Sequence, residues 1–126
     1  MKPLNVRRLR LSKEADNWIR VLKSRTGITP NLLCRLGFCL SLEETQRPNP
    51  SKYPEDSDRE INRYTLLGEL EPVLVALLKQ RTLRDGRSAD DDLDEQFRAH
   101  MNRGIVLLAG RLKTLSELTG LFRKTS

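Results

Sequence analysis

The 126-residue chain is poor in the side chains on which most metal sites and acid–base active sites depend. It has one histidine and two cysteines, and the cysteines do not stand in a Cys-x-x-Cys spacing. A single histidine excludes histidine-rich and Cys₂His₂ metal sites, and two cysteines cannot form a disulfide framework. The glycines are scattered singly, so no phosphate-binding loop is present. We therefore expect no metal, no cofactor and no catalytic residue, and we predict that the chain is not an enzyme.

Aromatic residues and long apolar runs are also scarce. Aromatics make up 5% of the chain and apolar residues 37%, so the core should be thin and dominated by leucine. No apolar run approaches the roughly 18 residues needed to cross a bilayer, and the start of the chain lacks the apolar core of a signal peptide. We expect a cytoplasmic protein without membrane contact. The length fits a single domain over residues 1–126, since chains of about 100–150 residues usually build one core.

Positive charge, by contrast, is abundant and unevenly placed. The chain has 23 Lys and Arg against 17 Asp and Glu, a formal net charge of +6. Residues 1–40 hold nine basic and two acidic side chains, residues 41–100 hold nine and fourteen, and residues 101–126 hold five and one. The basic character therefore belongs to the two ends of the chain. Such sorting favours a positive face directed at nucleic acid, with a merely solvated basic face as the alternative.

The pattern over residues 1–42 predicts a basic strand followed by two helices. From Arg8 to Leu11, basic and apolar side chains alternate, which predicts a short strand or an extended arm with guanidinium groups on its free face. Ser12 suits the N-cap of a helix over about 13–25, and Gly27 suits its end. Groups of this kind neutralise backbone phosphates without reading sequence. The candidate DNA-binding residues are Arg7, Arg8, Arg10, Lys13, Arg20, Lys23 and Arg25.

The second predicted helix, about residues 30–42, is apolar on nearly every side. Thr29 suits its N-cap and Pro30 its first position. A helix apolar all round is buried, and we do not expect one small subunit to cover it. We predict a homo-oligomer with this helix in a subunit interface. The residues predicted to make oligomer contacts are Leu9, Leu11, Cys34, Phe38 and Leu42.

The rest of the chain predicts a connection and then more helices. Residues 43–58 contain three prolines and no periodicity, which is typical of an exposed connection. Residues 59–126 form the helical remainder, with Gly104 expected to end one helix and a capping-box pattern at 114–117 expected to open the last. The predicted fold is mainly α: a short N-terminal strand or extended arm, then about five or six helices.

Two features that suggest chemistry have simpler interpretations. The acidic run of residues 90–95 lacks the residue order of a calcium loop, and carboxylates at a helix start interact favourably with the helix dipole. His100 falls on the inward stripe of its helix and has no second partner for a catalytic triad. We therefore expect a helix start at the acidic run and a hydrogen-bonded core histidine at position 100.

Two resemblances to known proteins follow from the order of these elements. A basic strand, a Ser-capped helix, a glycine turn and a second helix resemble a ribbon-helix-helix unit, in which two chains pair their strands and place them in the major groove. A longer resemblance is carried by residues 9–15, 22–28, 33–35, 39–42 and 100–105. Its most specific parts are Arg25-Thr26-Gly27-Ile28 and Cys39-Leu40-Ser41-Leu42. Over nearly its full length the chain resembles the DndE family of bacterial DNA sulfur modification proteins.

The second resemblance implies a role in DNA phosphorothioation, in which sulfur replaces a non-bridging phosphate oxygen. It implies a non-catalytic, DNA-binding homotetramer that prefers nicked double-stranded DNA and works with DndC and DndD type proteins. A nick suits such a protein, because an interrupted strand lets the duplex bend at lower elastic cost. The first resemblance implies the alternative, a ribbon-helix-helix transcriptional repressor or antitoxin that binds a palindromic operator.

Overall fold

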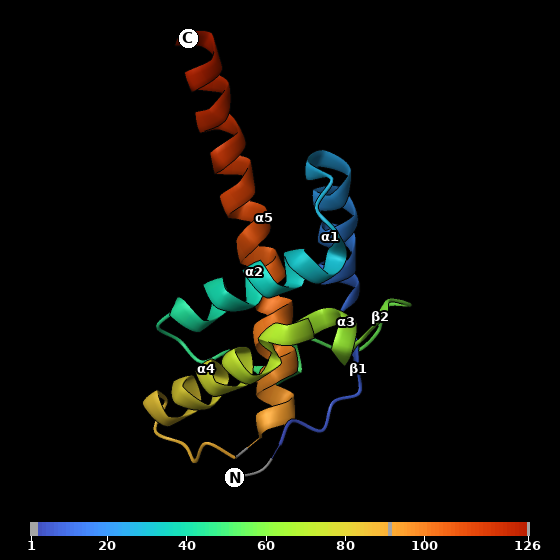
Figure 1. The fold of residues 1–126 in the computed structure, drawn as a ribbon, viewed down its shortest axis with the longest axis vertical. Helices are drawn as coiled ribbons and strands as arrows, with labels where there is room; N and C mark the ends of the chain where they lie inside the picture. The colour runs from blue at the N-terminus through green and yellow to red at the C-terminus, as the bar shows by residue number, and fades with distance from the viewer. Residues whose placement is uncertain (1–2, 91, 126) are drawn as a thin grey trace.

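The longest helix, α5 (Leu93–Thr125), forms the axis of the fold, and the other elements pack around its first half (Figure 1). The structure is a computed structural model that describes residues 3–90 and 92–125, with side chains up to residue 112. At 33 residues, α5 is about 50 Å long, since an α-helix rises about 1.5 Å per residue. Helix α2 (Pro30–Glu43) makes the most extensive contact with it, and α1 (Lys13–Thr26) and α4 (Glu71–Arg84) also touch it.

Local signals place the first two helices where the sequence predicts them. Ser12 is the N-cap of α1, and its Oγ accepts a hydrogen bond from the Ala15 amide at 3.2 Å. Gly27 ends α1 with a φ of 74°, a left-handed conformation that glycine adopts without strain. Pro30 opens α2 at a position where its missing amide costs nothing. Both predicted helices are confirmed to within one residue at each end.

The predicted N-terminal strand is present, but it pairs within its own chain. β1 (Arg8–Arg10) runs antiparallel to β2 (Glu60–Asn62), with Leu9 opposite Ile61. In a ribbon-helix-helix protein the strand pairs instead with the same strand of a second chain. The predicted ribbon-helix-helix start is therefore not confirmed, and the repressor or antitoxin alternative loses its structural support.

The proline-rich connection of residues 43–58 returns the chain to β1 and α1. It contains a short 3-10 turn, η1 (Pro50–Lys52), and most of its side chains are exposed, as predicted. Its end is tied down, however: the Ser57 amide donates to the Leu11 carbonyl at 3.2 Å, and Asp56 Oδ1 accepts from the first amide of α1 at 2.8 Å. The end of the connection is thus ordered, and it places β2 beside β1.

The second half of the chain has fewer helices than predicted. After β2 come a short α3 (Arg63–Leu67), a 3-10 turn η2 (Gly68–Leu70), α4 and α5. Across residues 3–90 and 92–125 there are four long helices, α1, α2, α4 and α5, where the sequence predicts five or six. The expected breaks at Gly104 and Thr114 do not occur, because α5 continues through both.

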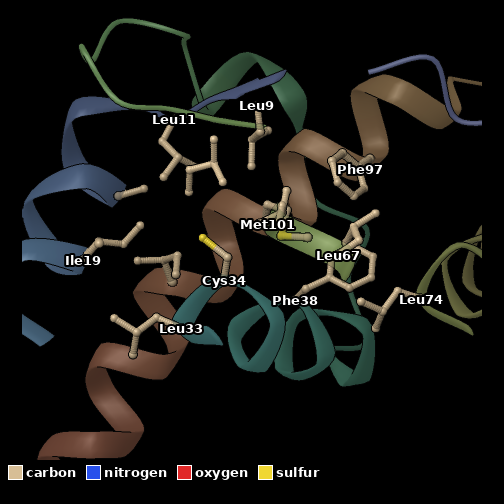
Figure 2. Packing of buried hydrophobic residues seen from close by; sticks show 14 of the residues in the cluster. Leu9, Leu11, Ile19, Leu33, Cys34, Phe38, Leu67, Leu74, Phe97 and Met101 are labelled. Carbon is tan, nitrogen blue, oxygen red and sulfur yellow. The ribbon is translucent and has the colours of Figure 1, made fainter. Parts of the chain in front are cut away.

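Buried apolar side chains from all four long helices and from β1 form one core, shown in Figure 2. Phe38 of α2 lies against Phe97 of α5, with ring centroids 5.8 Å apart. Leu67 and Leu74 bring α3 and α4 into the same cluster. The core is dominated by leucine, as the composition predicts, and α5 lies at its centre.

This core contains most of the residues that were predicted to contact a partner subunit. Leu42 is half-buried. The other four are completely buried within a single chain: Leu9, Leu11, Cys34 and Phe38. The structure corrects the expectation that a second subunit must cover them, because α5 already covers the inner face of α2. On the outer face of α2, Leu32 and Leu36 are 44% and 49% exposed.

Two glycines allow α2 and α5 to cross with their backbones in contact. A Cβ added at Gly37 would lie 2.6 Å from the carbonyl carbon of Gly104, and one added at Gly104 would lie 2.1 Å from the oxygen of Gly37. Real Cβ atoms essentially never approach another atom below 3.0 Å. Close packing therefore accounts for glycine inside both helices, despite its low helix propensity.

Candidate nucleic-acid interface

The β1–β2 ribbon has one apolar face and one charged face. Leu9 and Ile61 point into the core, so strand alternation places their neighbours on the other side. The outward-facing side chains are Arg8, Arg10, Glu60 and Asn62. Arg10 Nη2 lies 2.7 Å from Glu60 Oε1, whereas Arg8 Nη1 is 3.8 Å from the other Glu60 oxygen and its side chain is 69% exposed. One carboxylate thus holds Arg10 firmly and Arg8 weakly.

An open cleft of about 450 Å³ lies where β1 and α3 meet, at the end of this ribbon. We call it the arginine–tyrosine cleft, and its lining residues are Arg7, Arg8, Asn62, Arg63 and Tyr64. Arg7 is exposed and makes no ion pair with any other residue that the structure describes. Tyr64 is 75% exposed. The cleft therefore combines available positive charge with an accessible aromatic ring.

Arg63 fixes one wall of the arginine–tyrosine cleft. Its Nη1 donates to the Leu4 carbonyl at 2.6 Å, and its Nε lies 3.0 Å from Oε1 of Glu71. Its backbone amide donates to the Arg7 carbonyl at 2.9 Å. Its guanidinium carbon is 5.7 Å from the centroid of the Tyr64 ring, within cation–π range. Because its own charge is engaged, the role of Arg63 is to hold Arg7 and Tyr64 beside each other.

Along α1 the predicted basic residues are partly neutralised. Lys13 and Arg20, seven positions apart, share one face of the helix. Arg20 Nη2 lies 3.1 Å from Oδ2 of the buried Asp16. Asp56 and Asp58, from the folded connection, line the same shallow cleft as Lys13 and Arg20. These carboxylates lower the positive potential, so this stretch attracts phosphate less than the sequence predicts.

The last turn of α1 carries two further candidates, Lys23 and Arg25, which we call the α1 tip. Both are exposed, and neither forms an ion pair within the described part of the chain. Since α1 has 14 residues, the tip lies about 20 Å from the start of the helix, where the ribbon is attached (Figure 1). The seven predicted residues therefore form separate cationic groups rather than one patch.

Sequence reasoning missed Asn62, Arg63 and Tyr64. They belong to the middle of the chain, whose net charge is negative, so charge counting points away from them. The available local signal was an arginine next to one of only two tyrosines in the chain. What brings them to Arg7 and Arg8 is the β1–β2 pairing, which no local pattern specifies.

His100 is the hydrogen-bonded core histidine that its position predicts. Its Nδ1 lies 2.8 Å from Ser41 Oγ, and the Nε of Arg103 donates to the same hydroxyl oxygen at 2.8 Å. Burial and, to a lesser extent, the nearby positive charges of Arg103, Arg81 and Arg47 together lower the pKa of His100 to about 3. The imidazole is therefore neutral, and its tautomer decides whether Nδ1 or the Ser41 hydroxyl donates in this hydrogen bond.

Several arginines cap the C-terminal ends of helices by donating hydrogen bonds to backbone carbonyls. Arg103 and Arg81 each donate to a carbonyl in the last turn of α2 at 2.7 Å, where α2 has no basic residue of its own. Arg35 donates to the Leu66 carbonyl near the end of α3 at 2.6 Å. The carbonyls at a helix C-terminus carry partial negative charge, so a cation there is stabilising. These guanidinium groups hold the fold together and do not add to the cationic groups on the surface.

Two other kinds of site receive no support from the described residues. No group of three or more His, Cys, Asp and Glu side chains among them could hold a metal ion. In the acidic run, Asp90 and Asp92 pair with Lys79 and Arg47, Asp94 and Glu95 occupy the first turn of α5, and Asp91 lies outside the described residues. None of the helices described here has the length and apolar character needed to cross a membrane.

The comparisons with known proteins point to one family. Residues 8–116 match the model of the family described as DNA sulphur modification protein DndE. That range runs from β1 into the second half of α5 and includes the whole of the β1–β2 ribbon. The chain belongs to the DndE family. The family resemblance predicted from the sequence is thereby confirmed.

Solved structures of DndE share this fold. A crystal structure of DndE from Escherichia coli B7A, involved in DNA phosphorothioation modification, is 29% identical, with a TM-score of 0.69 over 85% of this chain and 99% of that chain. A crystal structure of a glycine-to-lysine mutant of DndE, involved in DNA phosphorothioation, is 28% identical, with a TM-score of 0.63 over 83% of this chain and 98% of that one. A comparison with curated protein sequences found no match.

Proposed function

We propose that this chain is the non-catalytic, DNA-binding component of a cytoplasmic DNA phosphorothioation machinery. In this role it binds the duplex backbone and prefers nicked DNA. Membership of the DndE family supports the process. The observation that carries DNA binding is that Arg7, Lys23 and Arg25 are exposed and have no carboxylate partner within the described chain. Unpaired surface cations that neutralise phosphates release the counterions condensed on DNA, which favours binding.

The burial of the one hydroxyl–imidazole pair among the described residues supports a non-catalytic role. Ser41 and His100 are the hydroxyl and imidazole that lie at hydrogen-bond distance, and they are 0% and 1% exposed. A substrate cannot reach them without unfolding of the core. The sulfur chemistry is therefore assigned to other proteins of the system, of the DndC and DndD type, while this chain supplies contact with DNA.

The separation of the cationic groups supports a preference for nicked DNA. The α1 tip lies at the end of α1 away from the β1–β2 ribbon that carries the arginine–tyrosine cleft, and α1 is about 20 Å long. Along one DNA strand, phosphates recur about every 3.4 Å, so the length of α1 alone corresponds to roughly six of them. A duplex that bends between the two groups engages both, and a nick lowers the elastic cost of that bend.

We also propose a homo-oligomer, with a tetramer as the expected state, that assembles through the outer faces of α2 and α4. Their exposed apolar side chains, together with Leu70 of η2 just before α4, are Leu32, Leu36, Val73 and Leu77. A cleft of about 250 Å³ joins the two faces and is lined by Cys39, Leu42 and Leu77, among others. Exposed apolar side chains gathered on one face of a helix are typical of protein contacts. Leu42 is the one residue of the predicted interface that lies on this side.

A binding titration at two salt concentrations tests the DNA-binding proposal. Wild-type protein is titrated into a nicked and an intact duplex of the same sequence, with affinity measured by fluorescence anisotropy. We expect tighter binding to the nicked duplex and a steep loss of affinity as salt rises. Arg25→Glu and Lys23→Glu should each weaken binding several-fold at low salt and reduce the salt slope.

The matched control for these variants is Lys52→Glu. Lys52 is an exposed lysine on η1, outside both cationic groups, and its reversal changes the net charge by the same amount. Its effect on affinity should be clearly smaller. Equal losses for Lys52→Glu and Arg25→Glu would mean that net charge alone governs binding. Absence of binding to either duplex at low salt would refute the proposed function.

A further inference from the structure

We propose that the arginine–tyrosine cleft is a subsite for one unpaired nucleotide at a DNA strand interruption. Tyr64 stacks on the base of that nucleotide, and Arg7 and Arg8 bind its phosphate. This inference rests on the proposed function and adds to it a specific contact for the end of a broken strand.

The exposure of Tyr64 is the first observation behind this subsite. The side chain is 75% exposed although the core lies directly below α3, where Leu66 and Leu67 are completely buried. The helix start does not depend on the ring, because the Tyr64 amide is capped by Asn62 Oδ1 at 2.8 Å. An aromatic ring left open to solvent is a stacking surface, and alanine substitution of such platforms commonly weakens single-strand binding.

The charge of the cleft is the second observation. No carboxylate is among its lining residues, whereas four other clefts of the described chain each include at least one. The nearest carboxylate to Arg8 is Glu60, at 3.8 Å, and Arg7 has no such partner among the residues described. Two guanidinium groups beside an exposed ring match a nucleotide, which has a phosphate next to a flat base.

The rigidity of the cleft is the third observation. Arg63 Nη1 donates to the Leu4 carbonyl, its Nε forms an ion pair with Glu71, and its backbone amide donates to the Arg7 carbonyl. Its guanidinium group also lies near the Tyr64 ring. The backbone that carries Arg7 and Tyr64 is therefore held in place before a nucleotide binds. A volume of about 450 Å³ is within the range of preformed small-ligand sites.

Stacking explains why the occupant is an unpaired nucleotide. In an intact duplex both faces of every base are covered by neighbouring bases, so Tyr64 has nothing to stack on. At an interruption the terminal nucleotide has lost one covalent neighbour, and unstacking it costs least where the strand is already broken or mismatched. The subsite thus gives a preference for nicks beyond the lower cost of bending.

The test uses a nicked duplex with a one-nucleotide, 5′-phosphorylated flap that carries the fluorescent base 2-aminopurine. On addition of the full-length protein, we expect 2-aminopurine fluorescence to be quenched by wild type and by Tyr64→Phe, which keeps the ring. With Tyr64→Ala the quenching should disappear. Its affinity for the flapped duplex should fall roughly tenfold, while affinity for the intact duplex should stay the same.

Arg7→Gln tests the phosphate contact in the same assay. It should bind the phosphorylated flap less tightly and lose most of the difference between 5′-phosphate and 5′-hydroxyl flaps that wild type shows. Leu83→Ala is the control for loss of exposed apolar surface, because Leu83 is 58% exposed at the end of α4. It should behave as wild type. Circular dichroism confirms that each variant is folded.

The outcomes separate the subsite from the proposed function. If Tyr64→Ala quenches 2-aminopurine and binds the flapped duplex as wild type does, the subsite is refuted while DNA binding stands. If Arg7→Gln keeps the full preference for the 5′-phosphate, the phosphate contact is refuted. If wild type binds none of the duplexes at low salt, the proposed function fails and the subsite fails with it.

Discussion

Gly37 of α2 and Gly104 of α5 face each other where the two helices cross, and each occupies space that a side chain on the other would need. The crossing brings Phe38 against Phe97 and sets Ser41 beside His100. The position of α2, and therefore of everything attached to it, depends on this contact between backbones.

Alanine at either glycine should destabilise the fold. Gly37→Ala or Gly104→Ala inserts a methyl group into a gap of less than 3 Å, and overpacking of this kind costs about 1–3 kcal/mol. Gly110→Ala is the control, because a Cβ at Gly110 in the same helix would meet no described side chain and no other element within 4 Å. It should be neutral or stabilise by up to about 1 kcal/mol through helix propensity. Urea unfolding measures all three, and a stable Gly104→Ala would contradict the close crossing.

His100 should make stability depend on pH below neutrality. Its pKa is lowered to about 3 in the folded chain, from an ordinary value of 6.5. Below pH 6.5 the unfolded chain takes up a proton that the folded chain does not, so the free energy of unfolding falls as pH decreases toward 3. Between the two pKa values, the folding equilibrium constant changes by nearly tenfold per pH unit. Above pH 6.5, His100 is neutral in both the folded and the unfolded chain, so its full contribution to the free energy of unfolding is present.

The measurement is chemical denaturation at pH 7, 6 and 5. Because His100 is the only histidine, and because Asp and Glu in unfolded chains titrate near pH 4, this range isolates its effect. His100→Gln should be less stable at pH 7 but nearly independent of pH over the range. If the free energy of unfolding depends on pH equally in wild type and in His100→Gln, another group causes the effect.

The two cysteines should differ sharply in reactivity. Cys34 is buried, and burial raises the pKa of its thiol to about 12. Cys39 is exposed, and partial burial followed by the charge of Glu43 raises the pKa of its thiol. In a Cys39→Ser variant, a thiol reagent at pH 8 should label Cys34 only as fast as the chain unfolds. Rapid labelling under native conditions would show that α2 is not covered as described.

Removal of Glu60 should strengthen DNA binding. Glu60→Gln releases Arg10 from a 2.7 Å ion pair and Arg8 from a 3.8 Å one. Surface ion pairs contribute about 0–1 kcal/mol to stability, so the variant should remain folded. We expect a several-fold gain in affinity for duplex DNA at low salt, measured by anisotropy. Glu55→Gln, which breaks the pair with Arg98, makes the same charge change elsewhere and should give a smaller gain.

A charge on the outer face of α2 should disrupt assembly. Leu36 is 49% exposed and lies on the proposed α2–α4 contact surface. Leu36→Glu should convert the oligomer to smaller species in sedimentation velocity, with the helical content unchanged. Trp18→Glu places the same charge on a partly exposed apolar position of α1 and should leave assembly intact. If Leu36→Glu assembles as wild type does, the contact lies elsewhere.

Features encoded by a few neighbouring residues are those that the sequence predicts well. Ser12, Gly27 and Pro30 each act within one turn of helix, and they place the ends of α1 and α2. Features encoded by tertiary contact are predicted poorly. Gly104 appears as a helix breaker in the sequence, but the approach of Gly37 gives it a packing role inside α5.

The same distinction applies to the candidate site. Composition identifies which residues are cationic, but it does not say which carboxylate each one meets. Arg10 and Arg20 are paired because β2 and the first turn of α1 place Glu60 and Asp16 beside them. Tyr64 joins Arg7 only through strand pairing, which depends on residues far apart in the sequence.

The arginines that bind helix carbonyls change what the net charge of +6 means. Arg35, Arg81 and Arg103 are held by backbone carbonyls, so they contribute to the net charge but their guanidinium groups do not contact a phosphate directly. A lysine in their place would preserve the charge but lose the planar fork that reaches carbonyls. Relatives of equal isoelectric point therefore differ in their affinity for a polyanion such as DNA. What distinguishes them is how many guanidinium groups the fold leaves unused.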